Sequence, residues 1–497
     1  MHARRPLSIA FCALAIAGCA SLEGRQQNIQ ATGSGDDSSC RAWLRSVDGE
    51  VADAGVADDS GFRVPGFPYL RVSRFLASFR QDALGDPAIF EDWANAARRL
   101  DREAREVEMR NLPSSQLGAL GATSPADPAA RTEACATELM RAELAAPPAR
   151  ARALANSAVP DDYENWNRVL GLYPVLRIPF SAGVEGWHKE AIAAFNDYAS
   201  GRQPDAPTLR YLPAAGEPMS QEEVARLLAA HSVGTLSLLE LSPVQLTRLF
   251  DTFAPVLEIE TESGDDRIGT VQLDSASRAR VDTSAAVVYR RLAYTRMNGE
   301  ILPQLVYTAW FPARPRSAVL DVLAGRLDGL VFRVTLGRNG LPLVYDSIHP
   351  CGCYHMFFPT APLHARPAPD PSDEWAFVPA TLPQARARER VVLHVQSKTH
   401  YLTGVSIART VATDVYRLED EDLLRSLPAP AGGRRSIYSP DGLVAGSERL
   451  ERFLFWPMGV PSAGTMRQWG HHATAFLGIR HFDDAFLMQE RFAAAAK

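Results

Sequence analysis

The chain has 497 residues, of which 46% are hydrophobic and 22% are charged, and it contains 34 glycines and 35 prolines. This is the composition of a globular protein, and it argues against a disordered, collagen-like or coiled-coil chain. The formal net charge of −6 argues against non-specific nucleic-acid binding, which requires a basic surface. The length exceeds what one hydrophobic core accommodates, so we expect two or more domains.

The first residues have the pattern of a secretory leader. Arg4 and Arg5 give it a positive start, and the apolar run 6–17 follows. This run is too short to span a bilayer, which takes roughly 20 residues, so it predicts a cleaved export signal. Residues 16–19, Ile-Ala-Gly-Cys, resemble the lipobox of bacterial lipoproteins. The alternative is an ordinary secretory signal that happens to be followed by a cysteine.

The lipoprotein resemblance implies where the protein is held. In that family the bond between Gly18 and Cys19 is cut, and Cys19 then carries a diacylglycerol thioether and an acylated amine. Several acyl chains make such an anchor stable. Ala20, in place of an aspartate, implies sorting to the periplasmic face of the outer membrane. We therefore assign 1–18 to a signal peptide, and 19–60 to a lipidated flexible tether because it is rich in small and polar residues.

Four cysteines remain after the leader and the lipid site: Cys40, Cys135, Cys351 and Cys353. The envelope outside the cytoplasm is oxidising, so disulfides form there. Four cysteines allow three connectivities, and the sequence does not choose among them. We favour Cys40–Cys135, which joins the end of the tether to the helical region. That pairing leaves Cys351 and Cys353 for a mutual disulfide or for a metal.

Residues 61–254 are predicted to form a helical domain. Asp86 has the position of an N-cap, because a proline follows it at the first helical position. Capping boxes beginning at Ser220 and Ser242 predict two further helices. Five aromatic residues are predicted to pack in a core, with a ligand groove as the alternative: Tyr163, Trp166, Tyr173, Phe180 and Trp187.

Residues 255–497 are predicted to form a β-rich domain. Asn-Gly pairs at 298–299 and 339–340 separate apolar runs, which is typical of hairpin turns. The run 391–396 predicts a buried strand, and 484–496 predicts a terminal helix. The expected fold class is α+β, with a helical N-terminal region followed by a mostly antiparallel, β-rich C-terminal domain.

The first candidate site is His349-Pro-Cys351-Gly-Cys353-Tyr-His355. Thiolate and imidazole are ligands for zinc and copper, so these four residues are a candidate metal site. On a straight strand the outer two histidines would lie roughly 20 Å apart, whereas bonds to zinc are about 2.0–2.3 Å long. A metal site therefore requires a bend, which the proline and the glycine favour. The alternatives are a Cys351–Cys353 disulfide and histidines that only cap loop carbonyls.

Further polar residues form two more candidate groups. Lys398 is one of only three lysines among 52 Lys and Arg residues, and an amine, unlike a guanidinium, can shift its pKa. We assign Lys398 and His400 as candidate catalytic residues, with Lys398 stabilising an anionic transition state; the alternative is a surface loop. Three histidines are additional candidates: His394, His471 and His481. Acidic residues near the hairpin ends are candidate carboxylate partners, although turn chemistry explains them equally: Asp265 or Asp266, Asp328 and Asp346.

Two functions of different classes stay open. The first is an envelope lipoprotein whose His/Cys-rich site is metal-dependent, with a zinc or copper ion as cofactor, and hydrolytic towards envelope material. The second is a non-catalytic accessory or scaffold lipoprotein that binds an envelope protein or the cell wall and contains a structural Cys351–Cys353 disulfide. In both cases we expect contact with the membrane through the lipid anchor and no nucleic-acid partner.

Overall fold

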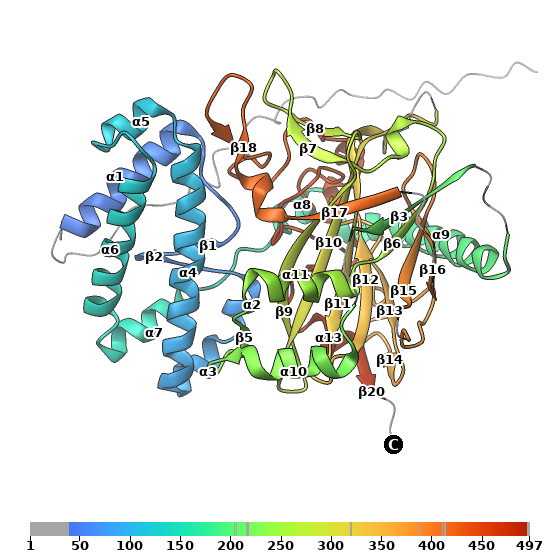
Figure 1. Cartoon of the computed structure of the whole chain (residues 1–497), viewed down its shortest axis with the longest axis horizontal. Coiled ribbons are helices and arrows are strands. Elements are labelled where there is room, and N and C mark those ends of the chain that lie inside the picture. The colour runs from blue at the N-terminus through green and yellow to red at the C-terminus, as the bar shows by residue number, and fades with distance from the viewer. Residues whose placement is uncertain are drawn as a thin grey trace, which may run out of the picture. The chain divides into compact units, whose positions relative to one another are not determined.

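The structure is a computed structural model that describes residues 39–494, except 203, 205, 215–217, 319–320, 387, 410 and 412–413. The predicted signal peptide, the lipidation site Cys19 and the first half of the predicted tether lie outside the described residues. Within the described range, no helix combines the length and the apolar character that crossing a bilayer requires. The fold is α+β, as predicted, with helices in the N-terminal part and a large sheet in the C-terminal part (Figure 1).

In the N-terminal part, helices pack around a two-stranded hairpin. Its elements are α1 (Ser39–Ala54), β1 (Phe62–Val64), β2 (Phe67–Val72), α2 (Arg74–Ala77), α3 (Arg80–Gly85), α4 (Pro87–Asn111), α5 (Ser114–Ala119), α6 (Ala126–Glu143) and α7 (Pro147–Ala155). The predicted disulfide between Cys40 and Cys135 is present and joins α1 to α6. The tether prediction is wrong for residues 39–54, because α1 buries Leu44 and Val47 in the helical core.

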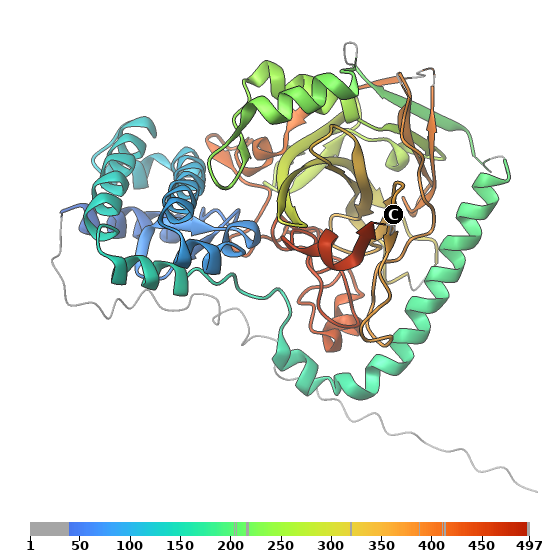
Figure 2. The ribbon, with the colours of Figure 1, turned by 90° about the horizontal axis from the view of Figure 1, so that it is seen from below.

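One ten-stranded sheet organises the C-terminal part, with the order β13-β12-β11-β10-β9-β17-β3-β6-β15-β16. Its strands are β3 (Thr208–Pro213), β6 (Val256–Glu260), β9 (Val287–Met297), β10 (Glu300–Arg314), β11 (Gly325–Leu336), β12 (Pro342–Ile348), β13 (Met356–Pro359), β15 (Arg390–Val395), β16 (Leu402–Ala408) and β17 (Asp414–Asp420). Parallel pairings join β17 to β9 and β3, and β6 to β15, while the other neighbours are antiparallel. Figure 2 shows how strongly the sheet curves.

The two predicted Asn-Gly turns connect the central strands. Asn298 and Gly299 have φ angles of 53° and 79°, a left-handed conformation that these two residue types adopt most readily. The second turn lies between β11 and β12. The resulting register places Arg333 of β11 opposite Asp346 of β12, and this pair reappears beside the candidate site.

Four helices and two short strands follow the N-terminal part: α8 (Asn165–Leu170), α9 (Tyr173–Ala199), α10 (Gln221–His231), β4 (Ser232–Val233), β5 (Leu238–Leu239) and α11 (Pro243–Phe253). Both predicted capping boxes, at Ser220 and Ser242, are present. Phe195 of α9 and Phe250 of α11 belong to the same core as the sheet, and β3 lies within the sheet. The segment that packs with the sheet therefore already includes α9. The boundary between the two parts lies before α9 and not at residue 254, where it was predicted.

The remaining elements lie around the sheet: η1 (Gly264–Asp266), β7 (Thr270–Leu273), β8 (Ala279–Asp282), β14 (Leu363–Ala365), η2 (Glu421–Arg425), β18 (Leu427–Pro428), β19 (Arg434–Arg435), α12 (Arg452–Phe455), η3 (Trp456–Met458), α13 (Leu487–Arg491) and β20 (Phe492–Ala494). The terminal helix predicted over 484–496 is present only as α13, and among the described residues the prediction is wrong for 492–494, which form β20. Phe492 is fully buried, and the backbone after it pairs with β14 as an antiparallel strand.

A cluster of ion pairs links the C-terminal part to residues 59–162. The Nδ1 atom of His471 lies 3.2 Å from a carboxylate oxygen of Asp162, and its Nε2 atom lies 3.1 Å from one of Asp59. His481 lies 3.1 Å from Asp161. Burial by itself would lower the pKa of His471, but Asp59 and Asp162 raise it to about 10. Two of the additional candidate histidines thus stabilise the junction between segments.

The raised pKa of His471 predicts a stability that declines in alkali. A histidine whose pKa rises from 6.5 to about 10 on folding stabilises the fold fully below pH 6.5, and this contribution disappears as the pH approaches 10. We expect the midpoint of urea unfolding to fall over this range, and to fall less in His471→Gln. The exposed His364 provides the control, since His364→Gln should retain the full decline. Parallel curves for the wild type and His471→Gln would contradict the assignment.

Candidate functional site

Residues 349–355 connect β12 to β13 through a tight turn. The backbone N–H of His349 donates to the carbonyl of Cys353 at 3.0 Å, and that of Gly352 donates to the carbonyl of His349 at 2.8 Å. Gly352 has a φ of 95°, and a Cβ atom there would lie 2.3 Å from the carbonyl oxygen of Ala473. Only glycine fits this position. The bend expected from the proline and the glycine is therefore confirmed.

The turn directs its two histidines to different carboxylates. The Nδ1 atom of His349 lies 3.3 Å from Asp328, and the Nε2 atom of His355 lies 2.9 Å from Asp346. Among the residues that the structure describes, no group of three or more His, Cys, Asp and Glu side chains is placed to hold a metal ion. A zinc or copper ion therefore does not fit the ligand set predicted from the sequence, which is not assembled: His349, Cys351, Cys353 and His355.

Asp328 on β11 is the centre of a buried ionic network. It has no exposed surface, and its two oxygens accept hydrogen bonds from Arg449 at 3.1 Å and from His400 at 2.9 Å. Burial by itself would raise the pKa of Asp328, but Arg449 and His349 hold it well below its usual range. The second ring nitrogen of His400 lies 3.5 Å from Asp266. The two candidate histidines His349 and His400 therefore lie close together, but both contact the carboxylate of Asp328.

Asp346 forms a second buried pair at the other end of the turn. Its two oxygens accept hydrogen bonds from the Nε atom of Arg333 at 2.9 Å and from the Nη2 atom of the same side chain at 2.5 Å. The second ring nitrogen of His355 lies 3.3 Å from the hydroxyl of Thr474. Burial lowers the pKa of His355 to about 3, so its ring is neutral at physiological pH. Carboxylates predicted as partners from the sequence thus hold both ends of the turn.

Cys351 and Cys353 are free thiols, so the disulfide predicted between them is not formed in the structure. The thiol of Cys353 donates a hydrogen bond to Cys351, which lowers the pKa of Cys351 against the effect of burial, and Arg449 lowers this pKa further. The same hydrogen bond raises the pKa of Cys353 well above its usual range. Cys351 therefore ionises first, and the thiolate is the reactive form of cysteine.

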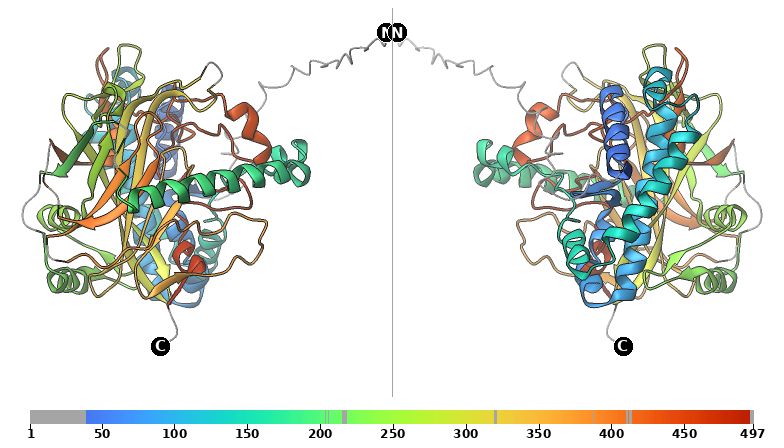
Figure 3. Two further views of the ribbon diagram at one scale, coloured as in Figure 1. Left: turned by 90° about the vertical axis from the view of Figure 1, so that its right-hand side faces the viewer. Right: turned by 90° about the vertical axis from the view of Figure 1, so that its left-hand side faces the viewer.

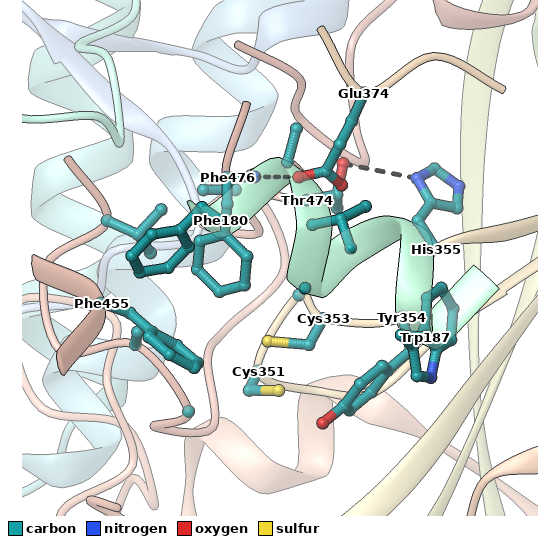
Figure 4. A pocket seen from close by; sticks show the side chains of 18 of the residues that line it. Phe180, Trp187, Cys351, Cys353, Tyr354, His355, Glu374, Phe455, Thr474 and Phe476 are labelled. Atoms are coloured by element: carbon teal, nitrogen blue, oxygen red, sulfur yellow. Dashed lines mark hydrogen bonds between the residues drawn. The ribbon is translucent and has the colours of Figure 1, made fainter. Parts of the chain in front are cut away.

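Both thiols border a cavity of about 480 Å³. Figure 4 shows the two side chains next to each other, between the rings of Phe180 and Phe455 on one side and those of Tyr354 and Trp187 on the other. The other walls come from the middle of α9, from the segment 451–464 that contains α12, and from the segment 473–480. Eight aromatic side chains line the cavity: Phe180, Trp187, Tyr354, Trp375, Phe377, Tyr401, Phe455 and Phe476.

The aromatic residues predicted to cluster between residues 163 and 187 lie in different environments. Phe180 and Trp187 line the cavity, so the alternative of a ligand groove describes them better than a packed core. Tyr163 is buried, as a core residue should be, whereas Trp166 is 69% exposed. The sequence pattern did not distinguish which of these aromatic residues line the cavity, which are buried and which are exposed.

A few polar groups interrupt the apolar wall. Burial raises the pKa of Glu451 to about 7, and burial lowers the pKa of His188 to about 4. The ring of His188 stacks on Phe377 with 4.0 Å between centroids, and the hydroxyl of Tyr401 donates to that of Tyr354 at 2.9 Å. Sequence reasoning missed Glu451 and His188, because neither belongs to a motif and both reach the cavity from distant segments.

The other sequence candidates lie elsewhere. Lys398 is on an exposed turn and pairs with Glu262, whose hydrogen bond raises the pKa of Lys398. Burial by itself would lower the pKa of His394, but Glu258 and Glu260 raise it to about 9. Neither Lys398 nor His394 lines the cavity. The catalytic role predicted for Lys398 therefore has no support from the geometry of the cavity.

Comparison of the chain with models of protein families, with curated proteins and with solved structures gives no match.

The hydrogen bond between the two thiols predicts selective alkylation. In the chain with Cys19→Ser and the Cys40–Cys135 disulfide intact, iodoacetamide at neutral pH should label Cys351 before Cys353, as measured by peptide mass spectrometry. Cys353→Ala removes the donor and should slow labelling of Cys351 by about tenfold for each unit by which its pKa rises. Cys353→Ser retains a hydroxyl donor and should preserve rapid labelling. Equal labelling of both thiols, or an unchanged rate in Cys353→Ala, would count against this arrangement.

Proposed function

We propose that the protein is a lipid-anchored component of the bacterial cell envelope that binds a small, largely apolar molecule in the cavity beside Cys351. The anchor is supported by the resemblance of residues 16–19 to a lipobox, which implies the periplasmic face of the outer membrane. Binding is supported by one observation, the cavity itself. The proposal places no metal ion in the site.

The cavity has the size and chemistry of a small-molecule site. Its volume of about 480 Å³ falls within the range of about 300–1,000 Å³ that is usual for ligand pockets. Apolar walls with a small number of polar groups favour a ligand with an acyl chain or an aromatic ring. The thiols and Glu451 provide the polar contacts that would orient the other end of the ligand.

A second candidate function is covalent catalysis at Cys351. The specific observation in its favour is that the thiol poised to ionise lies on the cavity wall, beside a carboxyl group, that of Glu451, with a pKa of about 7. The thiolate would attack the carbonyl of an ester and form a thioester, and the alcohol would leave after taking up a proton. Water would then hydrolyse the thioester and release the acid. This mechanism would carry out the hydrolysis predicted from the sequence, with Cys351 as the nucleophile and no step that uses a metal ion.

A leucine in the wall of the cavity should weaken ligand binding. Gly183 of α9 lines the cavity, and a Cβ atom there has open space around it, so the side chain of Gly183→Leu occupies part of the cavity without a backbone clash. We expect the dissociation constant of a fluorescent fatty acid, measured by titration without vesicles, to rise by about tenfold.

Gly186 supplies a matched control for this experiment. It lies in the same helix, also has open space for a Cβ atom, and does not line the cavity. Gly186→Leu gains the same helix propensity and should bind the probe as the wild type does. Unchanged affinity in Gly183→Leu, or no binding by the wild type, would refute the binding function.

The lipid anchor is tested in cells independently of the cavity. Cys19→Ser should abolish incorporation of labelled palmitate and release the protein from sedimented envelopes, because a thioester or thioether lipid needs the sulfur atom. Cys12→Ser changes a leader cysteine outside the lipobox and should leave both properties intact. Continued labelling of the Cys19→Ser protein would disprove lipidation at this residue.

A further inference from the structure

Exposed apolar side chains are concentrated in two short segments near the cavity. Of the 18 large hydrophobic residues that are exposed in the described part of the chain, ten lie in residues 166–178 and 450–456. The most prominent are Trp166, Leu170, Val175, Ile178, Phe453 and Leu454. We call this surface, formed by α8, the first half of α9 and α12, the apolar rim. In Figure 3 these elements project together beyond the sheet.

The two segments of the apolar rim form one continuous surface. A Cβ atom on Gly171, at the end of α8, would lie 2.5 Å from Pro457 of η3, and Arg168 donates to the carbonyl of Met458 at 2.9 Å. The rings of Phe180 and Phe455 lie 5.4 Å apart. An apolar surface of this extent is unusual on a soluble protein and indicates a partner.

The charge of the apolar rim differs from that of the whole chain. Its elements contain three arginines, Arg168, Arg177 and Arg452, and one acidic residue, Glu185, whereas the whole chain has a net charge of −6. Arg177 pairs with Asp373 at its edge, and Arg452 stacks over the ring of Phe453. Tryptophan and aliphatic side chains next to arginines are typical of surfaces that insert into the interface of a bilayer with anionic lipids.

The apolar rim is continuous with the cavity. Ile178 is 71% exposed, and the residues that follow it in α9, beginning with Pro179 and Phe180, line the cavity. On the other side, Phe453 is 62% exposed, whereas Phe455 lines the cavity. A bilayer in contact with the rim would therefore adjoin the mouth, and an acyl chain could enter without crossing water.

We propose that the apolar rim docks on an anionic lipid bilayer and that the cavity takes up an acyl chain of a membrane lipid from it. This inference rests on the proposed binding function of the cavity. The lipid anchor proposed for Cys19 would independently keep the chain at a membrane surface.

The test measures vesicle binding of the mature chain with Cys19→Ser, so that no covalent lipid contributes. We expect it to cosediment with vesicles of phosphatidylethanolamine and phosphatidylglycerol, and much less with phosphatidylcholine alone. Ile178→Glu combined with Phe453→Glu should reduce the bound fraction by about tenfold or more, because two charges must enter the interface. Val244→Glu on α11 is the matched control, since Val244 is 70% exposed but lies outside the rim, and it should bind normally.

Three outcomes would overturn the docking proposal. These are no binding of the parent chain to phosphatidylglycerol vesicles, an equal loss in Val244→Glu, or a concentration-dependent dimer that Ile178→Glu abolishes, which would make a second copy the partner. Affinity for the fluorescent fatty acid, measured without vesicles, is read separately for each variant. Retained probe binding with lost vesicle binding refutes docking alone, whereas lost probe binding by the parent chain refutes the function of the cavity.

Discussion

The buried carboxylate of Asp328 is the constraint on which the candidate site depends. An ionised group without exposed surface is stable only where hydrogen bonds and opposite charges compensate it. Asp328 receives that compensation from His349, His400 and Arg449, which lie on three segments well separated in the chain. The carboxylate therefore requires the turn after β12, the loop after β15 and the segment before α12 to converge at one end of β11.

This convergence also sets the chemistry of the thiol turn. His349 and His355 hold its two ends through Asp328 and Asp346, so the cysteines between them lie at the cavity wall without a metal. Arg449 acts on two groups at once, because it lowers the pKa of Asp328 and that of Cys351. The network that stabilises the turn thus also favours ionisation of the thiol that borders the cavity.

The cavity and the apolar rim have a common origin in α9. The first half of this helix lies against α12 and η3, leaving one side in solvent and the other facing the thiol turn. Exposure of apolar side chains to water is unfavourable, and a large exposed apolar surface is usually the contact site for a partner. The proposed lipid anchor, the apolar rim and the cavity beside it would together suit one proposed role, the handling of an acyl ligand at a membrane surface.

Features that neighbouring residues control could be predicted from the amino-acid pattern alone. The N-cap at Asp86, the capping boxes and the Asn-Gly hairpins are present as predicted, because hydrogen bonds and φ preferences within a few residues produce them. The Cys40–Cys135 disulfide and the bend of the His/Cys turn were also predicted. Three other outcomes became visible only in the folded chain: His349 and His355 bind separate carboxylates, Cys351 and Cys353 are free thiols, and β20 forms where a helix was predicted. Those outcomes depend on which distant segments pack together, and no local pattern contains that information.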